Sequence, residues 1–317
     1  MVQNDKKRVL ILLSAYNGEK YLREQLDSLL ELGGGFSYTV RIRDDGSGDG
    51  TRAILSEYAK RCGLEVLFGE NIGYNASFFS LIDGAEEDFD YYALCDQDDV
   101  WLPGKFVRAA EFFGREEGGP LLYSGVLCLA SEDLSESRVL PYPERGVGFY
   151  NAMIQNVCSG HTMVFNAPLL RLIKGTFCEE ILSYDHWILL AAAAFGKVLY
   201  DDVPQVLYRQ HGKNAVGASG GGKGAAKKLG YLRAGRGRAM ALQLQAFCTR
   251  FRDRLKEEYL REAERFLGAS GFCRRVKYAF RGKAYRQSRA ETFAFRFLFA
   301  LGAYRARPSR SPGKEKE

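Results

Sequence analysis

Three short polar segments hold the residues of this chain that could do chemistry. The first, Asp96-Gln97-Asp98-Asp99, places three carboxylates within four residues. Neighbouring carboxylates repel one another, so their clustering costs stability unless a cation or a set of donors neutralises them. Oxygen ligands suit Mg²⁺ or Mn²⁺, which proteins often hold with one or two carboxylates and the phosphates of a substrate. The alternative interpretation is an acidic loop that caps the helix after it.

A second acidic segment lies at Arg43–Ser47, and a third polar segment lies at Ser14–Asn17. In the second segment, Asp45 could accept the imide N–H of a pyrimidine base. In the third, Tyr16 and Asn17 offer an aromatic face and an amide. The acidic segment could instead serve only as the N-cap of a helix, since Ser and Asp are favoured there.

The elements that must position these segments alternate between strand and helix over the first 115 residues. Repeated β-α units predict a parallel sheet with right-handed crossovers, and ligands of such sheets bind beyond the carboxyl ends of the strands. Each polar segment directly follows an expected strand, so we expect the three to converge. The apolar patterns predict strands at Val9–Leu13, Thr39–Arg43, Leu64–Phe68 and Asp90–Cys95, and helices at Glu19–Leu32, Thr51–Lys60, Tyr74–Ala85 and Pro103–Phe113.

The rest of the chain is less regular. The Gly/Ser-rich stretch Ala215–Gly224 reads as a linker, helical patterns follow it to about Arg305, and the polar end is expected to be disordered. We therefore predict a catalytic domain over residues 1–222, a basic helical extension over 223–305 and a disordered tail over 306–317. Further strands are expected at Leu121–Leu129, Thr162–Phe165, Lys197–Tyr200 and Gln205–Tyr208, and a buried helix at Trp187–Phe195.

Charge divides the chain in the same place. The 317 residues are 46% hydrophobic and 26% charged, which excludes a disordered, collagen-like or disulfide-scaffold chain. The net charge of +6 hides a split, because residues 223–317 hold 25 Lys and Arg against 8 Asp and Glu, a net of +17, which leaves −11 for residues 1–222. A basic extension points to a polyanionic partner, either a nucleic acid or an anionic membrane surface.

The extension also interleaves its basic residues with aromatic and aliphatic ones, as in FAFRFLFAL. That composition is typical of a helix lying on anionic lipid, although the helices could equally pack on the catalytic domain with their charges in solvent. The N-terminus has only five consecutive apolar residues, and the seven cysteines form no CxxC pair. These features predict a cytoplasmic protein, with a peripheral position on the inner face of the cell membrane as the further expectation.

Six motifs occur in an order that resembles a known family: LLSAYNGEKYLREQLDSLL, RDDGSGDGT, ENIGYNASF, DQDDVWLPGK, SGHTMVFN and YRQHG. Together, over about residues 8–215, they resemble family 2 glycosyltransferases of the GT-A fold, especially the bacterial rhamnosyltransferase-like group. The resemblance implies an α/β fold with a Rossmann-like mixed sheet flanked by helices. It also implies transfer of a sugar from a nucleotide-diphosphate donor, with inversion at the anomeric carbon.

The resemblance assigns roles at the donor site. Asp45 would bind a pyrimidine base, Asp96 would lie near the ribose, and Arg209 would pair with the diphosphate. The donor would be dTDP-rhamnose or a UDP-sugar, and the acceptor a saccharide or a lipid-linked intermediate of the cell envelope. The remaining donor-site residues carried over from the motifs are Ala15, Tyr16, Asn17, Asn71, Gly73 and Ser77.

The resemblance also implies a metal site and a base. Asp98, Asp96 and His211 would hold Mg²⁺ or Mn²⁺, with Asp99 beside them, and the cation would neutralise charge on the departing diphosphate. Asp185, in Ser183-Tyr184-Asp185-His186-Trp187, is the candidate base for the acceptor hydroxyl. It could also cap the helix that follows. Related sequences usually read His-Asp-Trp-Trp here, so the acceptor site of this chain differs.

Two other functions compete with this one. A nucleotidyltransferase also uses paired aspartates on a Rossmann-like sheet, but it needs a Gly-rich triphosphate cradle that Ser14–Gly18 does not resemble. A nucleic-acid-binding protein would explain the basic extension but not the carboxylates at the strand ends. We therefore expect a glycosyltransferase and do not expect a nucleic acid as its partner.

Overall fold

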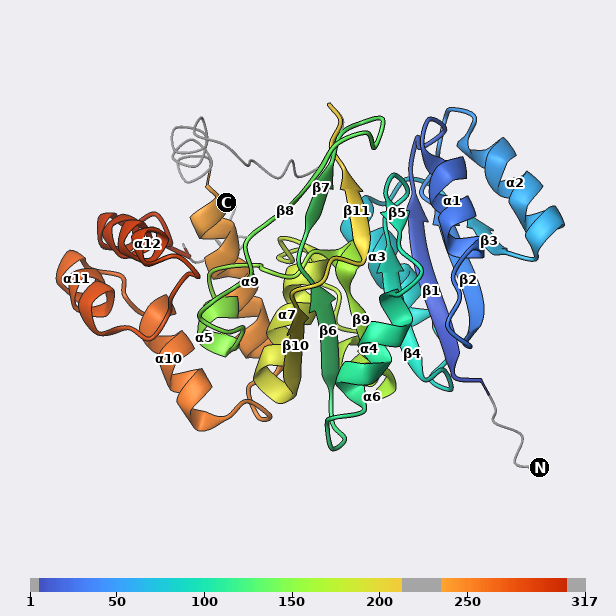
Figure 1. Ribbon diagram of the computed structural model, residues 1–317. Helices are drawn as coiled ribbons and strands as arrows, with labels where there is room; N and C mark the ends of the chain where they lie inside the picture. The colour runs from blue at the N-terminus through green and yellow to red at the C-terminus, as the bar shows by residue number, and fades with distance from the viewer. Residues whose placement is uncertain (1–5, 213–234, 307–317) are drawn as a thin grey trace, which may run out of the picture. The chain divides into compact units, whose positions relative to one another are not determined.

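The computed structural model describes residues 6–212 and 235–306, and the chain divides into two compact units, Met1–Gly220 and Gly221–Glu317 (Figure 1). The predicted linker at 215–224 lies outside the described residues, as does the expected disordered tail from residue 307 on. The three-part division of the chain at residues 222 and 305 therefore stays a prediction. No helix of the described residues is long and apolar enough to cross a membrane.

The first unit is built on a seven-stranded mixed sheet, as the resemblance implied. All neighbouring strands pair in parallel except β9, which runs antiparallel to both of its neighbours. In order across the sheet, and across Figure 1, the strands are β10 (Lys197–Asp201), β6 (Leu121–Gly125), β9 (Val164–Asn166), β4 (Tyr91–Cys95), β1 (Arg8–Ala15), β2 (Ser37–Asp44) and β3 (Glu65–Phe68).

Strand β1 occupies the middle of this sheet because its side chains are apolar on both faces. Val9, Ile11 and Leu13 belong to a core cluster shared with α1 (Leu22–Leu30), α2 (Thr51–Cys62) and α4 (Lys105–Phe113). Leu10 and Leu12 alternate with them and are equally buried, as required of a strand covered on both sides. Helix α3 (Tyr74–Asp83) contacts β1 and β2. Helices α6 (Ala167–Ile173) and α7 (Tyr184–Phe195) contact each other and strands further along the sheet, and α7 also contacts α3.

Two sequence-based boundaries were wrong. The single strand expected at Leu121–Leu129 is two strands in different sheets, because the chain leaves the main sheet after Gly125 and begins β7 at Cys128. The strand expected at Thr162–Phe165 begins only at Val164, since residues Gly160–Thr162 form the short 3-10 helix η1. The second sheet has the order β5 (Val100–Trp101), β11 (Val206–Arg209), β7 (Cys128–Ala130) and β8 (Ser137–Val139), and α5 (Phe149–Ala152) precedes η1.

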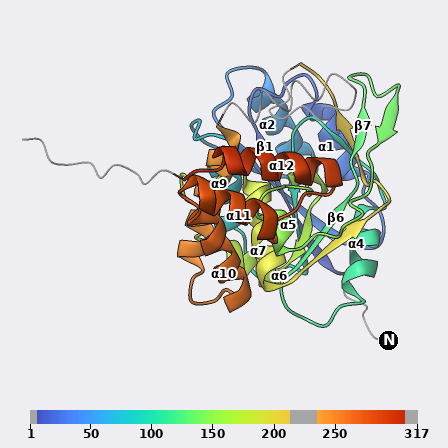
Figure 2. The same ribbon diagram turned by 90° about the vertical axis from the view of Figure 1, so that its left-hand side faces the viewer.

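The second unit is helical over its described residues, as expected. It contains α9 (Arg236–Arg250), α10 (Glu257–Leu267), α11 (Phe272–Arg281) and α12 (Arg289–Leu301). Helices α11 and α12 lie side by side in both views (Figures 1 and 2). An aromatic cluster fills the space between them and α10, and it consists of Phe266, Tyr278, Phe295, Phe299 and Tyr304.

Candidate functional site

The three polar segments predicted from the sequence meet at the carboxyl ends of β1, β2 and β4. Strand β1 pairs with both β2 and β4, so the loops after the three strands are neighbours. A pair of hydrogen bonds joins the first loop to the third. The Tyr16 N–H donates to Oε1 of Gln97 (2.7 Å), and Nε2 of Gln97 donates to the carbonyl of Tyr16 (3.0 Å). The amide of Gln97 therefore pairs with the N–H and the carbonyl of Tyr16, as the backbone of a neighbouring strand does.

The β1 loop is joined in the same way to the loop after β2. Asn17 has a positive φ of 48°, its N–H donates to Oγ of Ser47 (3.0 Å), and its Oδ1 accepts from the Gly48 amide (2.8 Å). The amide of Gly18 donates to Oγ1 of Thr51 (2.8 Å). The loops after β1, β2 and β4 thus form one hydrogen-bonded junction, which brings Ala15, Tyr16 and Asn17 beside the two acidic segments.

Asp45 connects this junction to the start of α3. Its side chain is 2% exposed, and its carboxylate accepts from the guanidinium of Arg43 (2.6 Å) and from the amides of Ile72 and Gly73 (both 3.0 Å). The predicted donor-site residues Asn71 and Gly73 therefore lie beside Asp45. The third residue predicted with them, Ser77, is buried at the other side of the first turn of α3, where its Oγ lies 2.6 Å from Oγ of Ser14.

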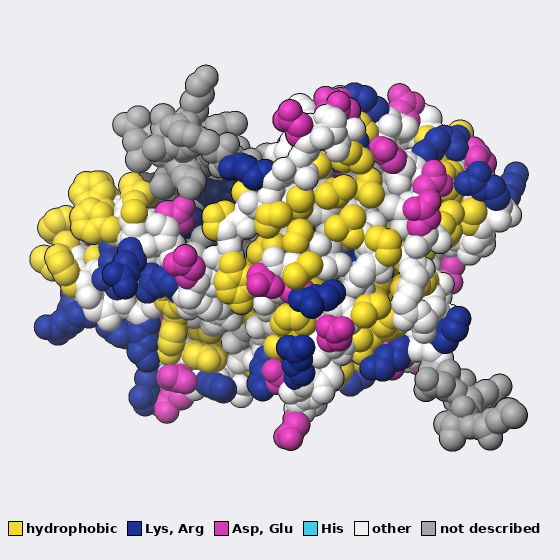
Figure 3. Space-filling model, viewed as in Figure 1, with side chains coloured by type: hydrophobic (Ala, Val, Ile, Leu, Met, Phe, Trp, Pro, Cys, Tyr) yellow, Lys and Arg dark blue, Asp and Glu magenta, His cyan; other side chains and the backbone are white. Residues whose placement is uncertain are grey.

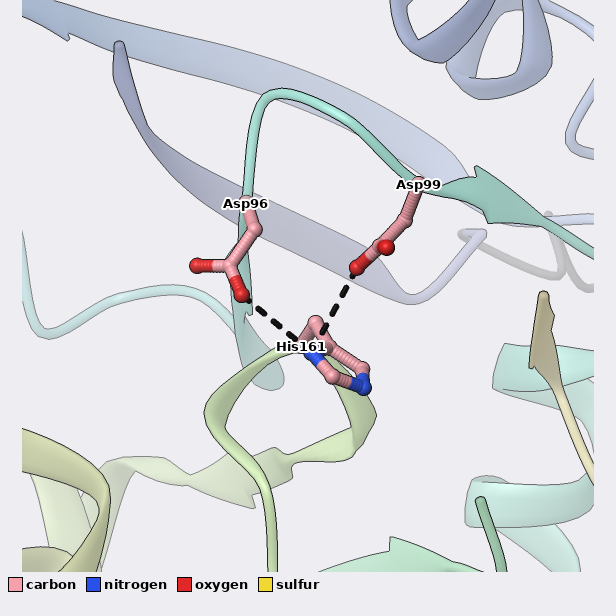
Figure 4. Close-up of side chains that lie close together, drawn as sticks. All are labelled: Asp96, Asp99 and His161. Atoms are coloured by element: carbon pink, nitrogen blue, oxygen red, sulfur yellow. Dashed lines mark hydrogen bonds and ion pairs between the residues drawn. The ribbon is translucent and has the colours of Figure 1, made fainter. Parts of the chain in front are cut away.

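In the acidic loop after β4, two carboxylates lie near one histidine and the third lies near another. Asp96 and Asp99 both point toward His161 of η1, whose Nδ1 lies 3.2 Å from Oδ2 of Asp96 and 3.4 Å from Oδ2 of Asp99 (Figure 4). The ligand-type atoms of these three residues lie within 4.8 Å of one another, close enough to hold a metal ion. His161 is thus part of the acidic cluster.

Asp98 faces the other histidine. Its Oδ2 lies 2.8 Å from Nε2 of His211, and the ring of His211 stacks on Tyr21 with the centroids 4.7 Å apart. Of the three residues predicted to ligate a metal, the structure therefore brings Asp98 and His211 together. Asp96, two residues away in the same loop, lies with His161 instead.

Burial raises the pKa values of two carboxyl groups in this loop. Burial raises the pKa of Asp98, and the nearby charge of Asp96 adds to the effect. Burial raises the pKa of Asp99 to about 7, and its Oδ2 is buried without a hydrogen-bond partner in the described residues. Burial alone would lower the pKa of His161, but Asp99 and Asp96 raise it. Carboxylate oxygens and imidazole nitrogens in a site that favours positive charge fit Mg²⁺ or Mn²⁺.

Lys105 supports the cluster from the first turn of α4. Its ammonium is fully buried, donates to the carbonyl of His161, and lies 3.6 Å from the centroid of the Trp101 ring. Burial lowers the pKa of Lys105 to about 7, although Cys95, Asp99 and Asp96 oppose the shift. The ring of Trp101 thus packs against the ammonium of this lysine.

Arg209 is held on several sides. Its amide donates to Oδ1 of Asp99 (3.1 Å), and its Nε donates to the carbonyl of Asp98 (3.0 Å). The guanidinium also pairs with the carboxylate of Glu24, donates to the carbonyl of Glu132, and is 2% exposed. These contacts fix the acidic loop on β11. The predicted pairing of Arg209 with a diphosphate stays a prediction.

The candidate base lies in the first turn of α7. Helix α7 begins at Tyr184, earlier than the sequence pattern indicated, and the carboxylate of Asp185 accepts from the amide of His186 (2.7 Å). Burial raises the pKa of Asp185, while hydrogen bonds to Ser183, His186 and Asn156 oppose the shift. The hydroxyl of Tyr184 donates to Oδ1 of Asp96 (3.3 Å), so the start of α7 adjoins the acidic loop.

Sequence reasoning missed four residues that organise this site: Gln97, Lys105, His161 and Tyr184. The position of Gln97 between Asp96 and Asp98 was a signal, since a polar residue there must lie at the same strand end. A second signal was the small number of histidines, since the chain has only three. In the structure, two of them contact the acidic loop.

Comparisons with known proteins agree on one family. Residues 10–139 match the family model described as Glycosyl transferase family 2. The dTDP-rhamnosyl transferase RfbG of Shigella flexneri is 27% identical over 238 residues, which cover 70% of this chain and 79% of RfbG. An uncharacterized protein of Mycobacterium tuberculosis is 26% identical over 203 residues, which cover 62% of this chain. The chain spans only 57% of the length of that mycobacterial relative.

Solved structures share the fold at low sequence identity. Residues 1–349 of Staphylococcus aureus TarS in complex with UDP-GlcNAc match with a TM-score of 0.56 at 16% identity, covering 94% of this chain and 81% of that one. The mannosyltransferase PcManGT of Pyrobaculum calidifontis in complex with GDP-Man and Mn²⁺ matches with a TM-score of 0.53 at 15% identity, covering 95% and 88%. At such identities the likeness concerns the fold alone.

Proposed function

Because residues 10–139 belong to the glycosyl transferase family 2, within a unit that has the GT-A fold, we propose that the protein is an inverting glycosyltransferase. It transfers a sugar from a nucleotide-diphosphate donor to a saccharide or lipid-linked acceptor of the cell envelope. One observation carries the proposal. The loops after β1, β2 and β4 are hydrogen-bonded into a single junction, which gathers Asp45 and the acidic segment Asp96–Asp99 at one edge of the sheet.

The nucleotide lies over this junction. Tyr16 is 48% exposed and offers its ring, Asp45 receives the base, and Asp96 meets the ribose. The first candidate donor is dTDP-rhamnose, because RfbG is named for that activity and aligns over most of its length. UDP-sugars come second, since TarS has been solved with UDP and with UDP-GlcNAc.

Asp98, Asp96 and His211 would hold Mg²⁺ or Mn²⁺. The 2.8 Å approach of Asp98 to His211, and the position of Asp96 two residues away in the same loop, support this assignment. The bound ion would neutralise negative charge on the departing diphosphate. Arg209, fixed on the backbone of Asp98, would add a second positive charge at the same end of the site.

Asp185 acts as the general base. The oxygen of an acceptor hydroxyl forms a bond to the anomeric carbon, the bond from that carbon to the diphosphate breaks, and the hydroxyl proton passes to the carboxylate of Asp185. Burial raises the pKa of this group above its usual range, and a higher pKa suits a base that must accept a proton during the reaction. Its hydrogen bond to the His186 amide holds one carboxylate oxygen in place.

The nucleotidyltransferase alternative is disfavoured by the same hydrogen bonds. A triphosphate cradle needs several free backbone amides at the end of the first strand. Here the amides of Tyr16, Asn17 and Gly18 all donate to side chains of neighbouring loops. We further propose a cytoplasmic protein that works at the inner face of the cell membrane, where envelope acceptors are assembled.

The experiment is a donor screen with a matched pair of variants. The protein is incubated with dTDP-rhamnose and a panel of UDP-sugars plus Mn²⁺ or Mg²⁺, and thermal shift and release of nucleoside diphosphate are measured. We expect one donor to raise the melting temperature and to be turned over. Asp98→Asn should lose metal-dependent turnover, whereas Asp202→Asn, the same change at an exposed loop residue, should not. Binding of no sugar nucleotide would overturn the proposal.

A further inference from the structure

Helix α12 displays apolar side chains on the face opposite its core. Phe295 and Phe299 are buried in the aromatic cluster, whereas Phe293, Phe297 and Leu301 are 74%, 59% and 61% exposed. The exposed three are spaced four residues apart, so they form one stripe along the helix. Because the buried face already supplies the packing that α12 needs, the stripe is not part of the core of this unit.

The neighbouring helix α11 adds to this surface. Phe272 and Phe280 are 62% and 79% exposed, eight residues apart on one side of the helix, while Tyr278 faces the core. Figure 3 shows hydrophobic side chains gathered over α11 and α12, with Lys and Arg directly beside them. We call Phe272, Phe280, Phe293, Phe297 and Leu301 the apolar stripe, and α11, α12 and their connection the hairpin.

The hairpin is strongly basic. From Phe272 to Leu301 the chain has eight Lys and Arg and a single acidic residue, Glu291. Arg274, Lys277, Arg281 and Arg289 are exposed, and none of them is paired with a carboxylate of the described part of the chain. These four charges are available to an anionic partner.

Other arginines of the hairpin have a structural task. Arg275 donates to the carbonyls of Ala300 and Ser270, and Arg296 donates to the carbonyl of Gly282, so these residues tie the two helices and their connection together. Two further arginines have similar tasks, since Arg286 pairs with the carboxylate of Glu291 and Arg305 donates to the carbonyl of Ser270. The exposed Arg274, Lys277, Arg281 and Arg289 remain beside the apolar stripe.

We propose that the hairpin binds an anionic membrane surface, with the apolar stripe inserted among the lipid chains and the exposed Lys and Arg paired with lipid phosphates. Exposed Phe and Leu beside basic side chains form the amphipathic pattern of helices that lie in the interface of anionic bilayers. A single-stranded RNA would also meet the charge. Its bases could also stack on the phenyl rings. However, the five exposed side chains, Leu301 among them, form an apolar surface bordered by basic residues, which fits lipid chains and lipid phosphates better. The inference does not depend on the proposed sugar transfer.

Vesicle flotation of the full-length protein tests the proposal. We expect binding to vesicles of phosphatidylcholine with phosphatidylglycerol, and little binding to phosphatidylcholine alone. The variant Phe280→Ser/Phe293→Ser/Phe297→Ser should bind the anionic vesicles at least about tenfold more weakly, because it removes most of the buried apolar area. Leu67→Ser, which removes a side chain 52% exposed on β3, is the matched control and should bind normally.

A second variant tests whether the exposed Lys and Arg pair with lipid phosphates. The triple variant Arg274→Gln/Lys277→Gln/Arg281→Gln should lose the preference for phosphatidylglycerol, and a control with the same loss of charge at exposed residues of the first unit should keep it. Equal binding to both vesicles, or unchanged binding by the Phe variant, overturns the proposal, as does binding of a single-stranded RNA in place of vesicles. That control is Lys60→Gln/Arg115→Gln/Arg171→Gln.

The circular dichroism spectrum of each variant, and its donor turnover without vesicles, should match those of the wild type. The membrane test can therefore fail or succeed independently of the test of the enzyme activity.

Discussion

Gln97 shows how a residue without chemistry of its own can organise a site. It stands between the two aspartates of the acidic loop, and its amide makes two hydrogen bonds with the backbone of Tyr16. Its Oε1 lies where a Cβ on Gly18 would be only 2.3 Å away, so Gly18 leaves the room that this contact needs. The position of Tyr16, and of any base that it stacks on, therefore depends on Gln97.

We expect Gln97→Leu to weaken donor binding more than it slows turnover. The variant loses both hydrogen bonds, each worth about 1 kcal/mol, so the KM for the donor should rise roughly tenfold or more while kcat falls less. Gln97→Glu keeps an acceptor for the Tyr16 amide and loses only the donor, so it should lie between wild type and Gln97→Leu. Steady-state kinetics with varied donor separates the two constants. An unchanged KM in both variants would contradict the positioning role.

Asp185 should control the acidic limb of the pH–rate profile. A base must be deprotonated to work, so activity falls as the pH falls through its pKa, and burial raises that pKa above the ordinary value of an aspartate. We therefore expect the loss to begin at a higher pH than an exposed aspartate would give. Asp185→Asn should lower kcat by about 10²- to 10⁴-fold. Glu179→Gln, an exposed neighbour in the same loop region, should leave both rate and profile unchanged.

At the scale of elements, the junction depends on a turn that only glycine fits well. Gly46, after β2, has a φ of 80°, and a Cβ there would lie 2.6 Å from the backbone nitrogen of Asn71. Gly46 thus lets the acidic turn approach the chain that leads into α3. The contact keeps Asp45 within reach of the Ile72 and Gly73 amides.

Gly46→Ala should separate these two segments. We expect it to destabilise the fold by about 1–3 kcal/mol through its strained φ and its backbone clash, and to weaken donor binding. Gly48→Ala, two residues on, meets no atom within 4 Å and does not need a positive φ, so it serves as the control. Urea unfolding of both variants measures the difference. Equal stability of the two variants would show that the loop relaxes without cost.

The elements also show what sequence can predict and where it stops. The apolar run at Val9–Leu13 and the turn signals around it were enough to place β1, because those patterns are local. The division of Leu121–Leu129 between two sheets was not predictable, since both halves are apolar and buried. His161 lies 65 residues from Asp96 in sequence, so only the tertiary fold shows that they meet.

At the scale of the whole molecule, the two units differ in the sign of their charge and in how much of it is exposed. The negative charge of the first unit is partly concentrated in the buried loop Asp96–Asp99, where Asp99 is fully buried. The positive charge of the second unit is largely exposed, and on the hairpin it surrounds an apolar surface. Salt screens exposed charges far more than buried ones, so the two groups should respond differently to ionic strength.

We expect added salt to separate membrane binding from cation binding. Raising NaCl from about 0.1 M to about 1 M shortens the Debye length from about 10 Å to about 3 Å, which should greatly weaken binding to anionic vesicles. The rise in melting temperature expected with Mn²⁺ should change less, because the side chains of Asp98 and His211 are only 18% and 8% exposed. Flotation and thermal shift at both salt concentrations provide the comparison. Loss of both effects in parallel would place the cation on exposed charges instead.

The pair of hydrogen bonds between Gln97 and Tyr16 has a consequence for how ligands bind. At the proposed donor site, the cation and the nucleotide base would contact different loops, and each ligand would restrict a loop that the other one needs. Binding of either should therefore favour the other, and thermodynamic reciprocity requires the two enhancements to be the same factor. The donor site would then behave as a cooperative pair of subsites, filled together or left empty together.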